Sequence, residues 1–387
     1  MTRNRVRQLG FWVLALILLL LSSCAEEDLT PPAPEQSIKI DPNPDEINAG
    51  WTLVTPQSLL IVGQGDSTVT DLEPGDYSLS WGEVTGWIRP DPATLENNLA
   101  ANGSLTFTGT YTEDLQIPPL GMIPLNPGNF LMGSPAGELG SSDEERPQHQ
   151  VTLSSQFGAL QPFEIAATEV TQYLWRAVMG GNNPSWFAPC DDCPVERVSF
   201  YDILRFCNEL SARQGLPKAY RETQWGWIWD PDSTGYRLPT EAEWEFACRA
   251  GSQTALSNGE VGGVACWRDP TLDQMGWFCG NAGGETHPVA GKTPNAWGLY
   301  DMHGNVWEWV WDLYGPYSSA AEENPTGPAQ GSFQVIRGGS WLYGIRRCRS
   351  AYRYRASPGS VSSDLGFRIA RFLTDGGTQP QGQEVGP

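Results

Sequence analysis

Residues 337–371 read RGGSWLYGIRRCRSAYRYRASPGSVSSDLGFRIAR and form the most informative stretch of the chain. The stretch holds eight Arg against one acid, Asp364, although the whole chain of 387 residues carries a formal net charge of −21. So many guanidinium groups need partners, which are either acids and carbonyls inside the fold or a bound anion. The stretch also holds a lone Cys348, eight residues after Ser340. How this cysteine is interpreted decides whether we expect an enzyme.

Length and composition limit the possible domain number and the possible partners. The chain is long enough for two domains, and its 17 Trp, 13 Phe and 12 Tyr supply ample material for packed cores. The excess of acid argues against a nucleic-acid partner and against electrostatic binding to anionic lipid. Any attachment to a membrane must therefore depend on something other than the charge of the protein.

The N-terminal residues have the pattern of an export signal. Three Arg precede an apolar run, residues 9–21, which is short for a membrane span. The predicted signal covers residues 1–23 and ends at Leu-Ser-Ser-Cys24, which resembles the lipobox of bacterial lipoproteins, where the cysteine is lipidated and becomes the new N-terminus. The alternative is a simple secretory signal followed by a free Cys24. We expect a lipid-anchored protein of the bacterial cell envelope, on the periplasmic or surface face of a membrane.

Two segments follow the signal. Residues 24–47 are rich in Pro and acid and predict an extended tether. Residues 48–115 alternate short β-type runs with Gly-Asp, Pro-Gly-Asp and Asn-Gly turn signals, which is typical of a small all-β sandwich. This segment resembles the immunoglobulin-like spacer modules of bacterial surface proteins, and we expect it to act as a stalk.

Residues 119–373 predict a second domain with little regular secondary structure, followed by a flexible tail at 374–387. Helical periodicity and capping signals predict three helices, at residues 168–179, 199–213 and 240–250. A domain with so much irregular backbone needs fixed turns, disulfides or metals to hold its loops.

Cysteine spacing bears on how those loops are held. Export places the cysteines after Cys24 in an oxidising compartment. Two closely spaced pairs predict disulfides, although sequence does not fix connectivity: Cys190–Cys193 and Cys266–Cys279. Cys207 and Cys248 fall on apolar helix faces and are predicted core residues.

Six motifs of the second domain occur in a fixed order. They are Gly128–Ser134 (GNFLMGS), Pro194–Ser199 (PVERVS), Tyr236–Glu245 (YRLPTEAEWE), Gly298–Trp309 (GLYDMHGNVWEW), Arg337–Trp341 (RGGSW) and Leu365–Arg368 (LGFR). In this order they resemble the formylglycine-generating enzyme family, also called the sulfatase-modifying factor family. The resemblance implies an α+β fold, a variant of the C-type lectin fold with little regular secondary structure.

The resemblance also implies a test for catalytic activity. In the oxidases of this family, cysteines three and eight positions after the Ser of Gly-Gly-Ser hold a copper(I) ion, which activates oxygen to convert a substrate cysteine into formylglycine. Here Cys348 occupies the eighth position, but the third is Tyr343. A phenol is a poor ligand for soft Cu(I), so we expect Cu⁺ not to bind. A formylglycine-generating oxidase acting on a sulfatase cysteine remains the alternative, and its catalytic residues would then be Cys348 and Ser340.

A metal of another kind is implied near residues 305–311. In the family the corresponding stretch binds calcium through carboxylate, amide and backbone oxygens, and Asn305, the backbone of Val306 and Glu308 match it. The resemblance thus implies a structural Ca²⁺ ion, with Asn281 as a weaker match to a second site. The alternative is an ordinary strand, which would place the three Trp of residues 307–311 on one face and the acids on the other.

The three histidines do not suggest a catalytic site. Relatives that form sulfoxides use an iron ion held by three His of a separate helical domain, which this chain lacks. We interpret His287 and His303 as residues that fix loops, and no spacing supports a Ser-His-Asp or paired-carboxylate arrangement.

Recognition remains as the expected function. The predicted ligand-binding residues are Trp341, Tyr343, Arg346, Arg347 and Arg349. Arg is bidentate and stacks on aromatic rings, so an acidic peptide, a sulfate or a sugar carboxylate is a suitable ligand. Most of the eight Arg are expected to be buried and to hold loop carbonyls and acids instead. The expected partners are the membrane, through lipidated Cys24, and a protein, peptide or glycan at the cell surface.

Overall fold

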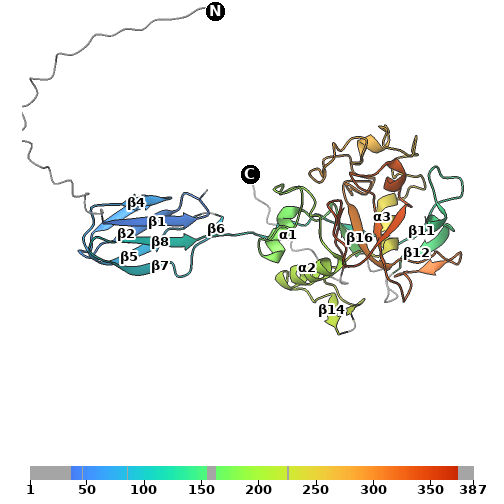
Figure 1. Cartoon of the computed structure of the whole chain (residues 1–387). Coiled ribbons are helices and arrows are strands. Elements are labelled where there is room, and N and C mark those ends of the chain that lie inside the picture. Colours follow the sequence, from blue (N-terminus) through green and yellow to red (C-terminus); the bar gives the residue numbers. More distant parts are fainter. Residues whose placement is uncertain (1–35, 46, 85, 155–162, 225, 374–387) are drawn as a thin grey trace, which may run out of the picture. The chain divides into compact units, whose positions relative to one another are not determined.

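The computed structural model describes residues 36–45, 47–84, 86–154, 163–224 and 226–373. They form two compact units that divide between Asp114 and Leu115 (Figure 1). The predicted export signal, Cys24 and the predicted tail lie outside the described residues. Within the described ranges no helix is both long and apolar enough to cross a membrane.

Unit 1 is an all-β sandwich. Its two main sheets have the strand orders β4-β1-β8 and β3-β2-β5-β7, and β6 pairs with β9. The strands are β1 (Ser37–Asn43), β2 (Gly50–Val54), β3 (Leu60–Gln64), β4 (Ser67–Val69), β5 (Gly75–Trp81), β6 (Trp87–Ile88), β7 (Thr94–Leu99), β8 (Ser104–Thr110) and β9 (Thr112–Glu113). Inward-facing apolar side chains such as Trp51, Leu79 and Phe107 form one core between the sheets.

The sandwich begins earlier than the sequence predicts. Strand β1 lies within the stretch predicted as tether and pairs with β8 along its whole length. Ile38 and Ile40 are fully buried, whereas Lys39 between them is exposed. This alternation is the period of a half-buried strand, and the surrounding Pro and acidic residues obscured it.

Unit 2 combines three helices with short strands and long loops. The helices are α1 (Gln172–Met179), α2 (Phe200–Arg213) and α3 (Glu241–Arg249), with short 3₁₀ turns η1 (Asp143–Glu145), η2 (Leu272–Gln274) and η3 (Ile345–Cys348). The strands are β10 (Met122–Leu125), β11 (Asn129–Met132), β12 (His149–Thr152), β13 (Phe163–Ala166), β14 (Tyr220–Thr223), β15 (Gly226–Trp229), β16 (Trp307–Leu313), β17 (Glu322–Glu323), β18 (Gln334–Arg337), β19 (Arg353–Ala356), β20 (Leu365–Gly366) and β21 (Ala370–Phe372). The three predicted helices are confirmed.

Local signals account for where the helices begin. Ser199 caps α2 and Thr240 caps α3, each in a full capping box with the acid three residues later. Helix α1 starts after Thr171, later than predicted. The preceding Val170 makes backbone hydrogen bonds to Phe367 and Val195 instead of joining the helix.

The central sheet of unit 2 has the order β19-β18-β16-β20. On one face Trp307 and Trp309 join the larger apolar core, with Trp311 packed against it. On the other face Glu308 and Asp312 are buried. The predicted alternation of indoles and acids along β16 is therefore confirmed, but the acidic face is buried and not solvated.

Helix α3 packs on this face of the sheet; all nine of its residues are buried, and its three acids form ion pairs. Glu241 pairs with Arg353 at 2.6 Å and Glu243 with Arg237 at 2.6 Å, while Glu245 pairs with Arg337. Each arginine comes from a different segment of the chain.

Five of the eight Arg in residues 337–371 form ion pairs. The pairs are Arg337 with Glu245, Arg349 with Glu145 and Glu138, Arg353 with Glu241, Arg368 with Glu308 and Arg371 with Glu164. The expectation that most of these arginines stabilise the interior of the domain is confirmed.

Both predicted disulfides are present, Cys190–Cys193 and Cys266–Cys279. The described free cysteines, Cys207, Cys248 and Cys348, are all buried. Disulfides of this kind are typical of a protein outside the cytoplasm.

Candidate functional site

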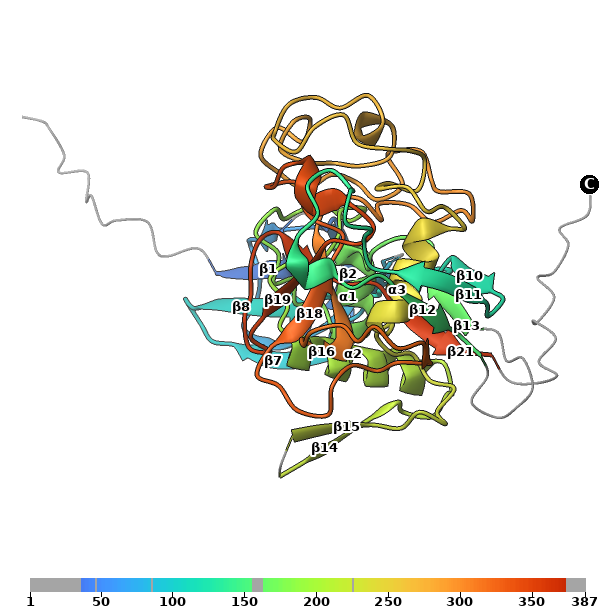
Figure 2. The same ribbon diagram turned by 90° about the vertical axis from the view of Figure 1, so that its right-hand side faces the viewer.

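The Gly-Gly-Ser turn after β18 positions the candidate site. Gly338 and Gly339 adopt positive φ angles of 93° and 76°. A side chain on Gly339 would place its Cβ 2.8 Å from both the Arg347 carbonyl oxygen and the Cys348 sulfur. Only glycine allows this close approach, which brings η3 back over the turn. Figure 2 shows η3 next to the gold loop segment, in agreement with backbone hydrogen bonds from Ile345 and Arg346 to Ala265 and Val264.

An aromatic and basic surface results, which we define as the aromatic–arginine surface: Trp341, Tyr343, Arg346, Arg347 and Tyr354. The guanidinium carbon of Arg347 lies 3.8 Å from the ring centroid of Tyr343 and 5.4 Å from that of Tyr354. Trp307 supports both tyrosines from beneath, with centroid separations of 5.9 and 6.1 Å. Trp341 is fixed by its indole N–H, which donates to the Ser363 carbonyl at 3.1 Å.

The predicted arginines separate into two groups. Arg346 is exposed and Arg347 half-buried, and no described acid forms an ion pair with either. Arg349 is fully buried, and its guanidinium donates to both oxygens of Glu145 at 2.7 and 2.8 Å. The prediction of a ligand contact for Arg349 is therefore corrected, because its charge is already neutralised inside the domain.

Cys348 does not reach the aromatic–arginine surface. Its side chain is fully buried in an apolar cluster with Ile345 and Phe278. Burial raises the pKa of the Cys348 thiol to about 12, so it stays protonated at neutral pH. Ser340 is also buried, and its hydroxyl donates to Asp364 at 2.8 Å. Neither side chain is presented to a substrate in this arrangement.

The residues implied as calcium ligands already have protein partners. Both carboxylate oxygens of Glu308 accept hydrogen bonds from Arg368, each at 2.7 Å, and one also accepts the Trp244 indole N–H. The side-chain oxygen of Asn305 accepts the backbone N–H of His287 at 3.0 Å. Ca²⁺ needs several oxygens that converge on one point. This set does not fit the ion, because an arginine occupies the place where a cation would lie. The calcium site remains a prediction without support from this geometry.

Asn281 is likewise engaged within its own loop. Its side-chain oxygen accepts the Phe278 N–H at 2.9 Å, and its amide donates to Asp273 and to the Gly276 carbonyl. These bonds describe a turn rather than a metal ligand.

The histidines fix loops, as predicted for two of them. His287 bonds to the Ala282 carbonyl at 2.8 Å and stacks on Trp277, and His303 bonds to the Cys348 carbonyl at 2.7 Å. Burial lowers the pKa of His303 to about 4, so its ring is neutral.

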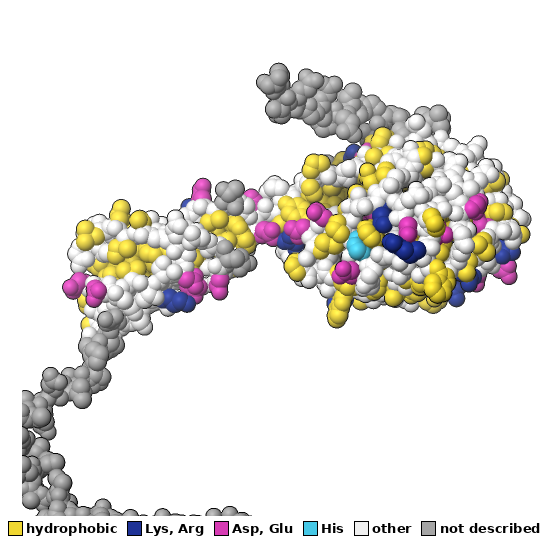
Figure 3. All heavy atoms as spheres, turned by 90° about the horizontal axis from the view of Figure 1, so that it is seen from above, with side chains coloured by type: hydrophobic (Ala, Val, Ile, Leu, Met, Phe, Trp, Pro, Cys, Tyr) yellow, Lys and Arg dark blue, Asp and Glu magenta, His cyan; other side chains and the backbone are white. Residues whose placement is uncertain are grey.

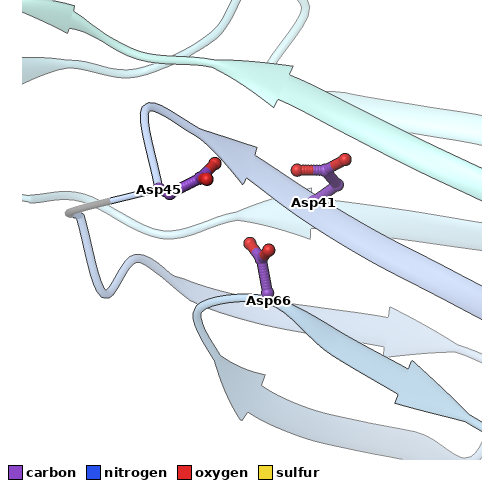
Figure 4. Close-up of side chains that lie close together, drawn as sticks. All are labelled: Asp41, Asp45 and Asp66. Atoms are coloured by element: carbon purple, nitrogen blue, oxygen red, sulfur yellow. The ribbon is translucent and has the colours of Figure 1, made fainter.

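A group of oxygen ligands also occurs in unit 1 (Figure 4). Carboxylate oxygens of Asp41, Asp45 and Asp66 lie within 4.8 Å of one another. Lys39 lies 3.0 Å from Asp41 and supplies a counter-charge, and Asp45 and Asp66 are exposed. Exposed acids of this kind need no ion to explain them.

Two exposed indoles near this part of unit 2 were not predicted. The exposed fraction is 67% for Trp186 and 79% for Trp267. Phe187, next to Trp186, packs edge-on against Trp341 at 5.4 Å. The loop is held by Glu196, whose carboxylate accepts the Phe187 N–H at 2.9 Å. Large apolar side chains that are exposed next to a candidate site favour a contact role. The irregular loops gave no periodic signal that could have marked them.

Comparison with known proteins agrees with the motif order. The family model for the sulfatase-modifying factor enzyme 1-like domain matches residues 109–373. The chain belongs to this family. The match covers unit 2, and the arrangement of short strands and few helices is that of sulfatase-modifying factor proteins.

Relatives within the sulfatase-modifying factor family have several names. The chain is 30% identical over 269 residues to Chaperone protein LppX of Paenibacillus barcinonensis, covering 61% of this chain and 86% of that protein. It is 39% identical over 318 residues to the formylglycine-generating enzyme of Mus musculus, covering 70% and 82%. The structure of Treponema denticola variable protein 1 has 33% identity and a TM-score of 0.58, covering 66% and 98%. The chain spans 38% of serine/threonine-protein kinase pkn1 of Chlamydia caviae, which it matches at 33% identity.

Proposed function

We propose that this protein is a lipid-anchored member of the sulfatase-modifying factor family that binds an acidic ligand at the cell surface and lacks copper oxidase activity. The observation that carries the proposal is the position of Tyr343, which stands where the first thiolate would be required and has the Arg347 guanidinium 3.8 Å from its ring centroid. A cation over this ring opposes binding of a second cation such as Cu⁺. The remaining cysteine, Cys348, is buried and protonated.

The same arrangement supports recognition of an anion. Arg346 and Arg347 form no ion pair with an acid among the described residues, although Arg346 Nε donates to the Gly140 carbonyl at 2.9 Å, so their charges are available to a ligand. The rings of Tyr343 and Tyr354 hold the Arg347 guanidinium in place, which lowers the entropy cost of binding a carboxylate or sulfate group. Because the protein has a net charge of −21, overall electrostatic attraction does not draw an anion to this site. The choice of ligand depends instead on the local geometry of the site. Figure 3 shows basic, acidic and hydrophobic side chains close together on one face of unit 2.

The oxidase alternative rests on the likeness to the formylglycine-generating enzyme of Mus musculus. Copper(I) titration of the purified protein separates the two functions. We expect no tight one-to-one binding by the natural chain, partial recovery by Tyr343→Cys, and none by the size-matched control Tyr343→Ser. Tight binding by the natural chain that is lost in Cys348→Ala would overturn the proposal. So would formylglycine in a Cys-x-Pro-x-Arg peptide incubated with the natural chain, copper and oxygen.

Ligand binding is tested separately with polymers of known charge. We expect immobilised polygalacturonate or dextran sulfate to retain the protein, and uncharged dextran not to retain it. Arg347→Ala should weaken retention, whereas Arg221→Ala should not, because Arg221 is exposed on β14, outside the aromatic–arginine surface. Equal retention of both variants would place the anion site elsewhere.

A further inference from the structure

Unit 2 contains a cavity of 320 Å³ outside the aromatic–arginine surface. It is lined by β12, the end of β16, the loops at residues 315–318 and 325–328, and β19. Arg353 of β19 lines it and is buried, whereas the next residue, Tyr354, is exposed. Adjacent residues of a strand point to opposite faces, so the cavity lies on the α3 side of the sheet. Its volume is within the usual range of small-molecule sites.

The positive charge of Arg353, which lines one wall of the cavity, is already neutralised. Arg353 donates to both oxygens of Glu241, at 2.8 and 2.6 Å, and to the Gly315 carbonyl. Its guanidinium also lies 3.9 Å from the ring centroid of Tyr317, whose hydroxyl donates to Glu241 at 3.0 Å. The arginine charge is therefore matched by Glu241 and offers little to an anion.

The polar atoms left over in the lining act as acceptors when Asp312 is ionised. Asp312 uses one oxygen to accept the Glu241 N–H at 2.8 Å, and its other oxygen has no partner among the described residues. The Nδ1 of His149 bonds to the Pro147 carbonyl at 3.0 Å, so that nitrogen carries the proton and Nε2 keeps a lone pair. Asp312 and His149 are 2% and 4% exposed. The Tyr317 oxygen keeps a lone pair after donating its proton.

We propose that this cavity binds a small organic cation that carries a primary ammonium group, with Asp312 as its counter-ion and His149 Nε2 and Tyr317 Oη as further acceptors. An ammonium group has three donors and no acceptor, which complements this lining. The aromatic wall of Tyr317 and the prolines at 316, 325 and 328 suit a short alkyl chain. Glu322, which also lines the cavity, adds negative charge.

The charges around Asp312 supply an additional readout. Burial raises the pKa of Asp312 well above its ordinary value, Glu241 and Glu243 of α3 add to the shift, and Arg353 of β19 opposes it. The other titratable groups that line the cavity are His149, Tyr317 and Glu322. A bound ammonium group would stabilise the carboxylate form of Asp312, so the affinity for the cation should rise with pH.

Titration calorimetry of the purified protein tests the site with three probes of similar length: 1,4-diaminobutane, 1,4-butanediol and succinate. We expect the diamine to bind with a Kd of about 1 mM or lower, and the diol and the diacid not to bind. The same titrations repeated at several pH values should show the diamine affinity rising with pH.

Substitutions locate the binding. Asp312→Asn keeps the acceptor for the Glu241 N–H and should lower diamine affinity by about tenfold or more. Asp232→Asn removes one exposed acid of the same unit and should leave the affinity unchanged. His149→Gln should weaken binding and keep the rise of affinity with pH. Circular dichroism and the melting temperature establish that each variant is folded.

Three outcomes would overturn the proposal. They are no diamine binding up to about 10 mM, equal binding of diol and diamine, and unchanged affinity in folded Asp312→Asn. None of them bears on the anion site or on copper, because the cavity and the aromatic–arginine surface lie on opposite faces of the sheet.

Discussion

Replacing Glu196 by Gln should remove a specific part of the pH dependence of stability. Glu196 is fully buried, one of its oxygens accepts the Phe187 N–H, and the other has no hydrogen-bond partner among the described residues. Burial raises the pKa of Glu196 from 4.5 to about 7; Asp364 adds to the shift, while the backbone N–H groups of Phe187 and Trp186 and the charge of Arg197 oppose it.

The direction in which the free energy of unfolding changes with pH follows from proton uptake by Glu196. Between its unfolded and folded pKa values the carboxyl group binds more protons in the folded protein, so the free energy of unfolding falls as pH rises through this window. With the two values 4.5 and about 7, the loss between pH 5 and pH 8 is about 2.5 kcal/mol. Glu196→Gln is neutral throughout and should not show this loss.

Urea unfolding at pH 5, 6, 7 and 8 measures the effect as the difference between the natural chain and Glu196→Gln. The difference cancels the titration of other buried acids such as Asp301, whose pKa burial raises to about 6. Glu260→Gln, an exposed site, serves as the control and should give a flat difference. A flat difference for Glu196→Gln, or one that shows the natural chain gaining stability with pH, would refute the reasoning.

Two further predictions concern what holds the candidate site in place. Arg349→Met leaves Glu138 and Glu145 buried without their cation and should lower the free energy of unfolding by about 3–5 kcal/mol. The control variant Arg346→Met, at an exposed position, should change it by less than about 0.5 kcal/mol. Similar urea midpoints for the two variants would contradict this prediction. The Cys266–Cys279 disulfide closes a longer loop, with a separation of 13 residues, than Cys190–Cys193, with 3. Its removal as a double Ser variant should cost about 3 kcal/mol and more than removal of the shorter one, and the reverse order in non-reducing urea unfolding would count against the loop-entropy account.

The features that could be predicted from the sequence are those with local or motif-level signals. Ser199 and Thr240 mark helix starts because their side chains cap the backbone directly after them. The Cys190–Cys193 disulfide could be predicted because its two cysteines are only three positions apart in the sequence. Strand β1 was missed because its two buried Ile sit in a Pro-rich and acidic stretch, where composition outweighed the alternation.

The candidate site depended on partners that are distant in sequence. Arg349 looked like a ligand contact because its acids, Glu138 and Glu145, lie more than two hundred positions earlier in the chain. Glu308 matched a calcium ligand in the motif, but its actual partner is Arg368, 60 positions later. Residue spacing cannot reveal which of several acids meets which arginine. The sequence alone shows that Tyr343 stands where a second thiol would be required, because this needs only counting from Ser340.

The buried ion pairs also limit the order in which this domain can fold during synthesis. Glu138, Glu145, Glu241 and Glu308 take their arginine partners from residues 337–368, close to the C-terminus. Until that segment emerges, burying these carboxylates would leave them without a counter-charge, which costs several kcal/mol each. The nascent domain is thus kept from closing prematurely. A chain truncated before Arg337 lacks these partners, so we expect an unfolded product that proteases can remove.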